Sequence, residues 1–244
     1  MRIYPVFGRL RYFMEDMRPK VYQYFIESDT DGRPINRIDR STIYQRAKKE
    51  NDTMPFGTQM DVYSEGYEWT CHSISPKNFH EMNHNPRIIF GNKDCLQPYN
   101  ASIYNISAMS YGSLSSNAIE ALNAGAKIGG FAHNTGEGGL SPYHLKHGGD
   151  IIWQIGTGYF GCRKEDGNFD ENLFAEKATL PNVKMVELKI SQGAKPGHGG
   201  ILPAIKNTEE IAAIRHIKPH TIVESPPFHK AFGTPLEMIL FIKK

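Results

Sequence analysis

Short apolar runs, each followed by a glycine-rich turn or a helical pattern, recur along the second half of this 244-residue chain. They occupy residues 104–109, 131–134, 151–155, 185–190 and 221–224. Runs of this length that are rich in β-branched and aromatic side chains and bounded by glycine are typical of strands. Strands that alternate with helices build a parallel sheet, so the pattern predicts an α/β fold.

Helix signals occupy the segments between these runs. A helix should begin near residues 115–117 and stop at Gly129 and Gly130, and Ser141 followed by Pro142 predicts a second start. Three pairs of residues have the spacing of a capping box, in which two side chains satisfy the first N–H groups of a helix. These pairs are Asn117 with Glu120, Asn207 with Glu210, and Thr234 with Glu237.

Repeated βα units with short glycine loops predict a (β/α)8 TIM-type barrel, with its ligand at the carboxyl ends of the strands. Such a barrel needs eight units and about 250 residues, whereas residues 101–244 contain about half of that. We therefore expect this region to be the N-terminal half of a barrel. Residues 1–100 are polar and rich in turns, and we expect them to form an irregular N-terminal cap or arm. A small open α/β sheet, complete in itself, is the alternative.

The densest chemical signal is the segment 189–203, which follows the apolar run 185–190. It contains four glycines and two prolines, so it cannot continue as regular structure. Glycine lets the main chain approach a ligand closely, and Lys189, Gln192 and Lys195 supply donors for an anionic, planar guest. The segment predicts a ligand loop at the carboxyl end of a strand. A surface turn with solvated lysines is the alternative.

Two motifs match known functional signatures, but in each case the residues that follow disfavour the helix that the signature requires. Residues 80–84 fit the HExxH zinc-protease pattern, but Pro86 follows closely and proline disfavours helical geometry in the residue before it. Residues 156–161 fit the GxGxxG dinucleotide pattern, but a polar turn follows where a helix should begin. We therefore predict neither a metal site nor a dinucleotide site, and we expect residues 156–161 to shape another loop at the ligand face.

Composition and charge narrow the class of protein further. With 28 Lys and Arg against 26 Asp and Glu, the net charge of +2 gives no indication of a nucleic-acid partner. The cysteines Cys71, Cys95 and Cys162 form no CxxC pair, which favours a reduced, cytoplasmic location. Basic and aromatic residues interleave over residues 2–20. We expect an amphipathic segment packed on its own domain, with a membrane face as the alternative.

Three motifs in order carry a family resemblance, namely residues 107–113, 134–139 and 189–203. From about residue 22 to its end, the chain resembles the FMN-binding synthase domain of glutamate synthase. It is most similar to the stand-alone FMN-binding glutamate synthase family proteins, of which it would be the N-terminal part. The resemblance implies formation of L-glutamate from 2-oxoglutarate and ammonia, with hydride delivered by reduced FMN to the carbon of an imine.

The resemblance also assigns roles to individual residues. Lys195 and Gln192 should bind the oxo-acid, with Lys195 as a candidate acid, and Glu137 should handle the protons of ammonia or the imine. For Glu137 the alternative is a helix cap, and for Lys189 it is a solvated side chain at the end of a strand. The residues expected to hold the isoalloxazine ring of FMN are Ala108, Met109, Ser110 and Lys189.

Further parts of a complete glutamate synthase are expected outside this chain. No cysteine follows Met1, so an amidotransferase that supplies ammonia would be a separate subunit. An iron-sulfur cluster would come only from the downstream part, and the electrons from a donor protein or reductase subunit. The resemblance also allows a membrane anchor upstream of the sequence. We expect the fragment to be inactive alone.

This chain carries His198 and Ile201 where the large bacterial and plant enzymes usually carry an acid and a glutamine, and in this it matches the stand-alone proteins. Two other functions stay open on the sequence alone. The first is a flavin subunit similar to N-methylglutamate synthase, which would use an amine in place of ammonia. The second is a non-catalytic flavin-binding or assembly subunit.

Overall fold

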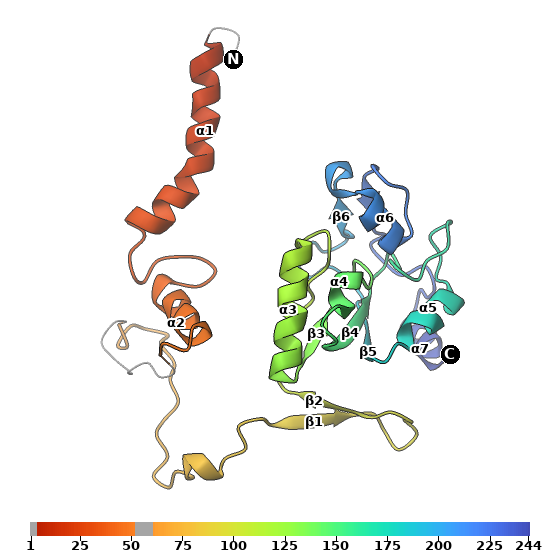
Figure 1. Cartoon of the computed structure of the whole chain (residues 1–244), viewed down its shortest axis with the longest axis horizontal. Coiled ribbons are helices and arrows are strands. Elements are labelled where there is room, and N and C mark those ends of the chain that lie inside the picture. The colour runs from red at the N-terminus through yellow and green to blue at the C-terminus, as the bar shows by residue number, and fades with distance from the viewer. Residues whose placement is uncertain (1–3, 52–60) are drawn as a thin grey trace. The chain divides into compact units, whose positions relative to one another are not determined.

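The computed structural model describes residues 4–51 and 61–244. The chain forms two compact units, Met1–Pro76 and Lys77–Lys244, whose elements are labelled in Figure 1. The sequence predicts a boundary between residues 100 and 101. In the structure this position lies inside strand β2 (Tyr99–Ser102). Each unit is described by itself below.

In the first unit, two helices flank a tight turn. Helix α1 (Pro5–Val21) runs into the π-helical turn η1 (Tyr22–Ile26), and α2 (Arg37–Ala47) follows. Glu27 is buried between them, where its carboxylate pairs with Arg40 and its carbonyl oxygen accepts a hydrogen bond of 3.2 Å from Arg37. These contacts fix the turn, because a buried carboxylate is stable only when it is paired.

The second unit begins with the 3-10 turn η2 (Phe79–Glu81) and a hairpin of β1 (Arg87–Phe90) and β2. The turn ends before His84, so the HExxH residues do not form the helix that a zinc protease needs. Within residues 4–51 and 61–244, no group of three His, Cys, Asp or Glu side chains could hold a metal ion. No helix in the same ranges is long and apolar enough to cross a membrane.

A parallel sheet forms the centre of this unit (Figure 1). It consists of β3 (Ala132–Asn134), β4 (Asp150–Ile155) and β5 (Val183–Leu188), in this order. The helices α3 (Ser116–Gly129), α4 (Pro142–Leu145) and α5 (Glu171–Ala178) precede or connect the strands. Neighbours in the chain are neighbours in the sheet, which confirms the predicted α/β class. The barrel itself stays a prediction.

The remaining elements follow β5. They are β6 (Ile201–Leu202), the 3-10 turn η3 (Ala204–Lys206), α6 (Glu209–Arg215), β7 (Val223–Glu224) and α7 (Pro235–Lys243). The apolar run 221–224 therefore yields a strand of two residues. This strand pairs antiparallel with β6 instead of extending the parallel sheet beside β5.

Some details of the sequence-based assignment were wrong. The run 104–109 forms one parallel bridge, from Ile106 to His133, instead of a strand. Helix α3 is capped by Ser115, whose side chain accepts from Ala118, and not by Asn117. Helix α6 is capped by Thr208 instead of Asn207. The predicted ends were correct at Gly130, which has a φ of 65°, and at the capping box of Thr234 with Glu237.

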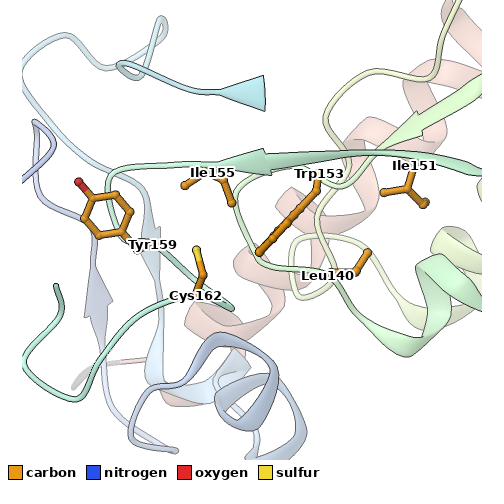
Figure 2. Packing of buried hydrophobic residues seen from close by; sticks show 6 residues of the cluster. All are labelled: Leu140, Ile151, Trp153, Ile155, Tyr159 and Cys162. Carbon is orange, nitrogen blue, oxygen red and sulfur yellow. The ribbon is translucent and has the colours of Figure 1, made fainter. Parts of the chain in front are cut away.

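The hydrophobic core lies on one face of β4 (Figure 2). Ile151, Trp153 and Ile155 alternate along the strand and point to the same side, where they pack with Leu140, Tyr159 and Cys162. The Trp153 ring stacks on Phe174 of α5 at 5.6 Å between centroids. Burial raises the pKa of the Cys162 thiol to about 12, so Cys162 is a packed, unreactive thiol. This core fixes the strand ends that carry the site.

Candidate active site

Three loops that follow consecutive parallel strands meet at the carboxyl edge of the sheet. Glu137 follows β3, Gly156 follows β4, and Lys189 and Gln192 follow β5. Because parallel strands end at the same edge, residues far apart in the sequence become neighbours there. Lys189 is anchored by its main-chain N–H, which donates to the carbonyl oxygen of Ile155 at 2.8 Å.

The Glu137 carboxylate is the centre of this cluster. Its two oxygens each lie 2.7 Å from Nε2 of Gln192, and Oε2 lies 3.6 Å from Nζ of Lys189. The Glu137 side chain is 20% exposed, so the carboxylate is largely enclosed yet reachable. A carboxylate oriented in this way by an amide donor and a cation is placed to accept a hydrogen bond from a bound reactant.

Two glycines make room for this carboxylate. A Cβ atom on Gly156 would lie 2.8 Å from Oε2 of Glu137, and one on Gly200 would overlap Oε1. Side chains at these positions would therefore push the carboxylate out of its place. Gly156 is the first glycine of the GxGxxG motif, and no helix follows that motif until Glu171. In this chain the glycine serves the packing of Glu137.

The loop Ala108–Met109–Ser110 packs against the loop that carries Glu137. A Cβ atom on Gly136 would lie 3.0 Å from the main-chain nitrogen of Ser110, and one on Gly138 would lie 2.9 Å from its Cβ. The N–H of Met109 donates to Asn134 at 3.1 Å. Across the described parts of the chain, the N–H groups of Ala108 and Ser110 donate to no protein acceptor, so both can donate to a ligand.

Lys195 stands apart from this cluster. It lies in an exposed turn in which its N–H donates to the carbonyl of Gln192 at 3.1 Å and its carbonyl accepts from His198 at 3.0 Å. The structure thus brings Glu137, Gln192 and Lys189 together, whereas the Lys195 side chain faces solvent. The neighbouring loops close over the cluster, and the recess between them has no room for a water molecule. This recess is lined by Glu137, Thr157, Lys189, Ser191, Gln192, His198, Pro226 and Pro227.

Comparison with known proteins decides the family. A family model described as a conserved region in glutamate synthase matches residues 37–244. The chain belongs to the glutamate synthase family. It is 36% identical to the glutamate synthase large subunit-like protein YerD of Bacillus subtilis (strain 168), in a match that covers 100% of this chain and 54% of YerD. The chain therefore spans about half the length of this relative.

Shorter matches connect the chain to further glutamate synthases. The archaeal-type glutamate synthase (NADPH) of Thermotoga maritima is 41% identical over 127 residues, which are 52% of this chain and 22% of that protein. The archaeal glutamate synthase (NADPH) of Archaeoglobus fulgidus is 39% identical over 140 residues, which are 57% of this chain and 25% of that protein. Members of the family are oxidoreductases of amino-acid biosynthesis that generally use flavin and iron-sulfur cofactors.

A buried histidine holds the Met109 end of the site. Nδ1 of His144 accepts from the N–H of Ser141 at 3.3 Å, so the ring proton is on Nε2, which donates to the carbonyl of Met109 at 3.0 Å. Burial lowers the pKa of His144 to about 4, so the ring is neutral at pH 7. The carbonyl and N–H of Met109 are thus both fixed by the protein.

A second buried histidine holds the Lys189 end in the same way. The hydroxyl of Tyr159 accepts from the N–H of Ala231 at 3.1 Å and can donate to Nδ1 of His229, also at 3.1 Å. Nε2 of His229 then donates to the carbonyl of Lys189 at 2.8 Å. Burial lowers the pKa of His229, which favours the neutral ring that this chain of hydrogen bonds requires.

Arg215 is a buried cation beside the same loops. Its guanidinium donates to the carbonyl of Tyr111 at 3.0 Å and lies 5.2 Å from the centre of the Phe160 ring. Burial lowers the pKa of Arg215, and the negative charge of Glu137 opposes that shift. Neither this residue nor the two histidines could be identified from a local pattern, because the main-chain carbonyl groups that they hold lie 35 or more residues away in the chain.

The buried histidines predict a loss of stability in mild acid. Burial lowers the pKa of His133 and His144 from 6.5 to about 4. Below pH 6.5 the unfolded chain binds protons that the folded chain excludes, so stability is full above pH 6.5 and declines as the pH falls toward 4. Each histidine should lower the free energy of unfolding by up to about 1.4 kcal/mol per pH unit.

Urea unfolding at pH 7.0, 6.0 and 5.0 measures this decline before most carboxylates titrate. In His144→Gln the free energy of unfolding should fall less steeply as the pH decreases, by the contribution of one histidine. Glutamine keeps a donor but binds no proton. Equal free energies of unfolding at pH 7 and pH 5 in the unaltered chain would contradict the assignment of neutral buried rings.

Proposed function

We propose that residues 101–244 form the first half of a (β/α)8 barrel that binds FMN and makes L-glutamate from 2-oxoglutarate and ammonia. One observation carries this proposal. A carboxylate, an amide and a lysine, Glu137, Gln192 and Lys189, converge at the carboxyl ends of successive parallel strands. Ligands of such barrels bind at this edge, and imine formation followed by reduction needs a proton acceptor beside a cation.

The residues at this edge fit a flavin. Lys189 provides a positive charge, which stabilises the negative charge of a reduced flavin ring. The N–H groups of Ala108 and Ser110 are directed to no protein acceptor in the described residues, and they suit the carbonyl oxygens and nitrogens of such a ring. When bound, FMN would supply the hydride. Residues Ala108, Met109, Ser110 and Lys189 would hold it.

The protein groups account for the remaining steps. Lys195 and Gln192 would bind the carboxylates of 2-oxoglutarate, Lys195 by moving in from its exposed turn. Glu137 would take a proton from ammonium, so that the free amine attacks the carbonyl carbon and water leaves to form the imine. Hydride at the imine carbon and a proton at its nitrogen then give L-glutamate. Gly156 and Gly200 leave room for the Glu137 carboxylate, which would lie beside the reacting nitrogen.

The chain spans about half of YerD. We therefore propose that catalysis also needs a part of the protein that corresponds to the region of YerD outside the match. We call this chain joined to that part the complete enzyme. That further part would supply the last barrel strands, which usually bind the phosphate of the ligand, and the cysteines of an iron-sulfur cluster. An electron donor protein or reductase subunit, and an amidotransferase as ammonia source, are the partners proposed.

Titration of FMN tests the proposal, with flavin fluorescence as the readout. The complete enzyme should bind FMN, and residues 1–244 alone should bind it at least about 100-fold more weakly, because they lack the phosphate-binding strands. Tight binding by residues 1–244 alone would refute the half-barrel assignment. Absence of binding by both forms would refute the flavin site.

A further inference from the structure

Helix α1 carries a continuous apolar stripe. At 100° per residue, seven side chains of this helix fall within an arc of about 120°. The most exposed of them are Val6, Phe7 and Met14, at 74%, 72% and 61%. The members of this stripe, which we call the α1 stripe, are Val6, Phe7, Leu10, Phe13, Met14, Met17 and Val21.

Basic residues of α1 border this stripe, and acidic residues lie farther from it. By the same spacing, Arg9 and Lys20 border it on one side and Arg11 and Arg18 border it on the other. The acidic residues of the helix project away from it, and one of them, Glu15, pairs with Arg11 at 3.0 Å. Four cations therefore flank the apolar surface, and no carboxylate of α1 interrupts it.

The stripe is uncovered within its own unit. Among the described residues of Met1–Pro76, neither η1 nor α2 buries it, and Phe13 is 58% exposed. The next turn adds two more exposed aromatic side chains, Tyr24 at 69% and Phe25 at 84%. The sequence-based expectation of a segment packed on its own domain therefore has no support within this unit. An apolar surface of this kind marks an interaction site.

We propose that α1 lies flat on an anionic lipid surface. Apolar side chains would enter the boundary between headgroups and acyl chains, while the flanking Arg and Lys side chains extend to the phosphates. A helix of 17 residues is about 26 Å long, and its charged far side keeps it parallel to the surface instead of across it. The distribution of charge favours this occupant over a second copy of the chain, since two copies would bring like charges together. The proposal is independent of the enzymatic function.

Co-sedimentation of the 244-residue chain with vesicles tests this proposal. The chain should bind vesicles of phosphatidylcholine with about a quarter phosphatidylglycerol, and it should bind pure phosphatidylcholine roughly tenfold more weakly. Binding to the anionic vesicles should weaken as salt is added, because salt screens the attraction between the helix and the lipid headgroups.

Matched variants separate the stripe from the rest of the helix. Phe7→Ser with Phe13→Ser should weaken binding to anionic vesicles at least roughly tenfold, and Arg11→Glu with Arg18→Glu should do so on the order of tenfold. Tyr12→Ser alters an exposed aromatic side chain on the opposite side, 53% exposed, and should bind like the unaltered chain.

Three results would overturn the proposal. The first is a chain that stays in the supernatant with anionic vesicles. The second is a stripe variant that binds as well as Tyr12→Ser. The third is a dimer, detected by analytical ultracentrifugation without lipid, that dissociates in the stripe variant, because a second copy would then cover the stripe.

Discussion

Replacing Glu137 with glutamine should lower the turnover of the complete enzyme by about 10²-fold to 10⁴-fold, the range for loss of a positioned general base. The amide keeps the shape of the side chain but cannot take a proton from ammonium. Nε2 of Gln192, 2.7 Å from both carboxylate oxygens, would still find an acceptor, so the fold should persist. Steady-state assays with 2-oxoglutarate and ammonium measure the loss, and FMN binding should stay within about threefold.

Glu120 offers a matched control for this substitution. Its side chain is also 20% exposed and also pairs with a lysine, Lys146, at 2.8 Å, but it lies on α3. Glu120→Gln should therefore leave the turnover unchanged within about twofold, since surface ion pairs contribute little. Equal turnover in Glu137→Gln and Glu120→Gln would remove Glu137 from the chemistry.

Gly199→Ala should destabilise the second unit by about 3 kcal/mol or more. Gly199 is buried, and a Cβ atom there would overlap the main-chain carbonyl of Ser225 and lie 2.9 Å from that of Pro226. Neither obstacle is a flexible side chain. The two segments are also bound together, since the N–H of Ser225 donates to Gly200 at 2.8 Å and β6 pairs with β7. This overlap could be relieved only by separating β6 from β7.

Thermal unfolding of residues 1–244 measures this effect. Gly199→Ala should lower Tm by about 10 °C, at roughly 2–4 °C for each kcal/mol in a chain of this size. Gly193→Ala is the control, because a Cβ atom there has no neighbour within 4 Å and the glycine lies in the same segment. Its Tm should stay within about 2 °C of the unaltered chain. Similar Tm values for the two variants would show that the β6–β7 packing is wrong.

The elements that could be predicted from the sequence are those set by local interactions. The apolar runs of β4 and β5 alternate with glycine loops and helices, and this was sufficient for the parallel sheet. Gly130 could be assigned as the end of α3, because its φ of 65° suits a residue without a side chain. Equivalent local chemistry identified Thr234 and Glu237 as the start of α7.

The sequence-based assignment was wrong where contacts between residues far apart in the chain determine the local structure. Asn207 has the spacing of a cap, yet it is fully buried and donates to the carbonyls of Lys218 and Thr221, so Thr208 takes the cap position. The run 104–109 has strand composition, but Ile106 alone pairs with β3. No local pattern contains this information, because the partners are set by tertiary packing.

The site also contains residues that could be found from the sequence and residues that could not. The meeting of Glu137, Gln192 and Lys189 agrees with their place after parallel strands, since such loops share one edge of the sheet. The histidines that fix the main chain of Met109 and Lys189 could not be found from the sequence. His144 lies 35 residues from Met109 and His229 lies 40 from Lys189, and a lone histidine in a sequence has no visible partner.

Reoxidation of the reduced flavin in the complete enzyme tests the central claim most directly. The flavin, reduced beforehand without oxygen, is mixed with substrates in a stopped-flow instrument and followed by its absorbance. We predict rapid reoxidation only when 2-oxoglutarate and ammonium are both present, with one L-glutamate formed per flavin and slow reoxidation in Glu137→Gln. Reoxidation that requires methylamine in place of ammonium, or none with either amine, would contradict the assignment of this chain to glutamate formation.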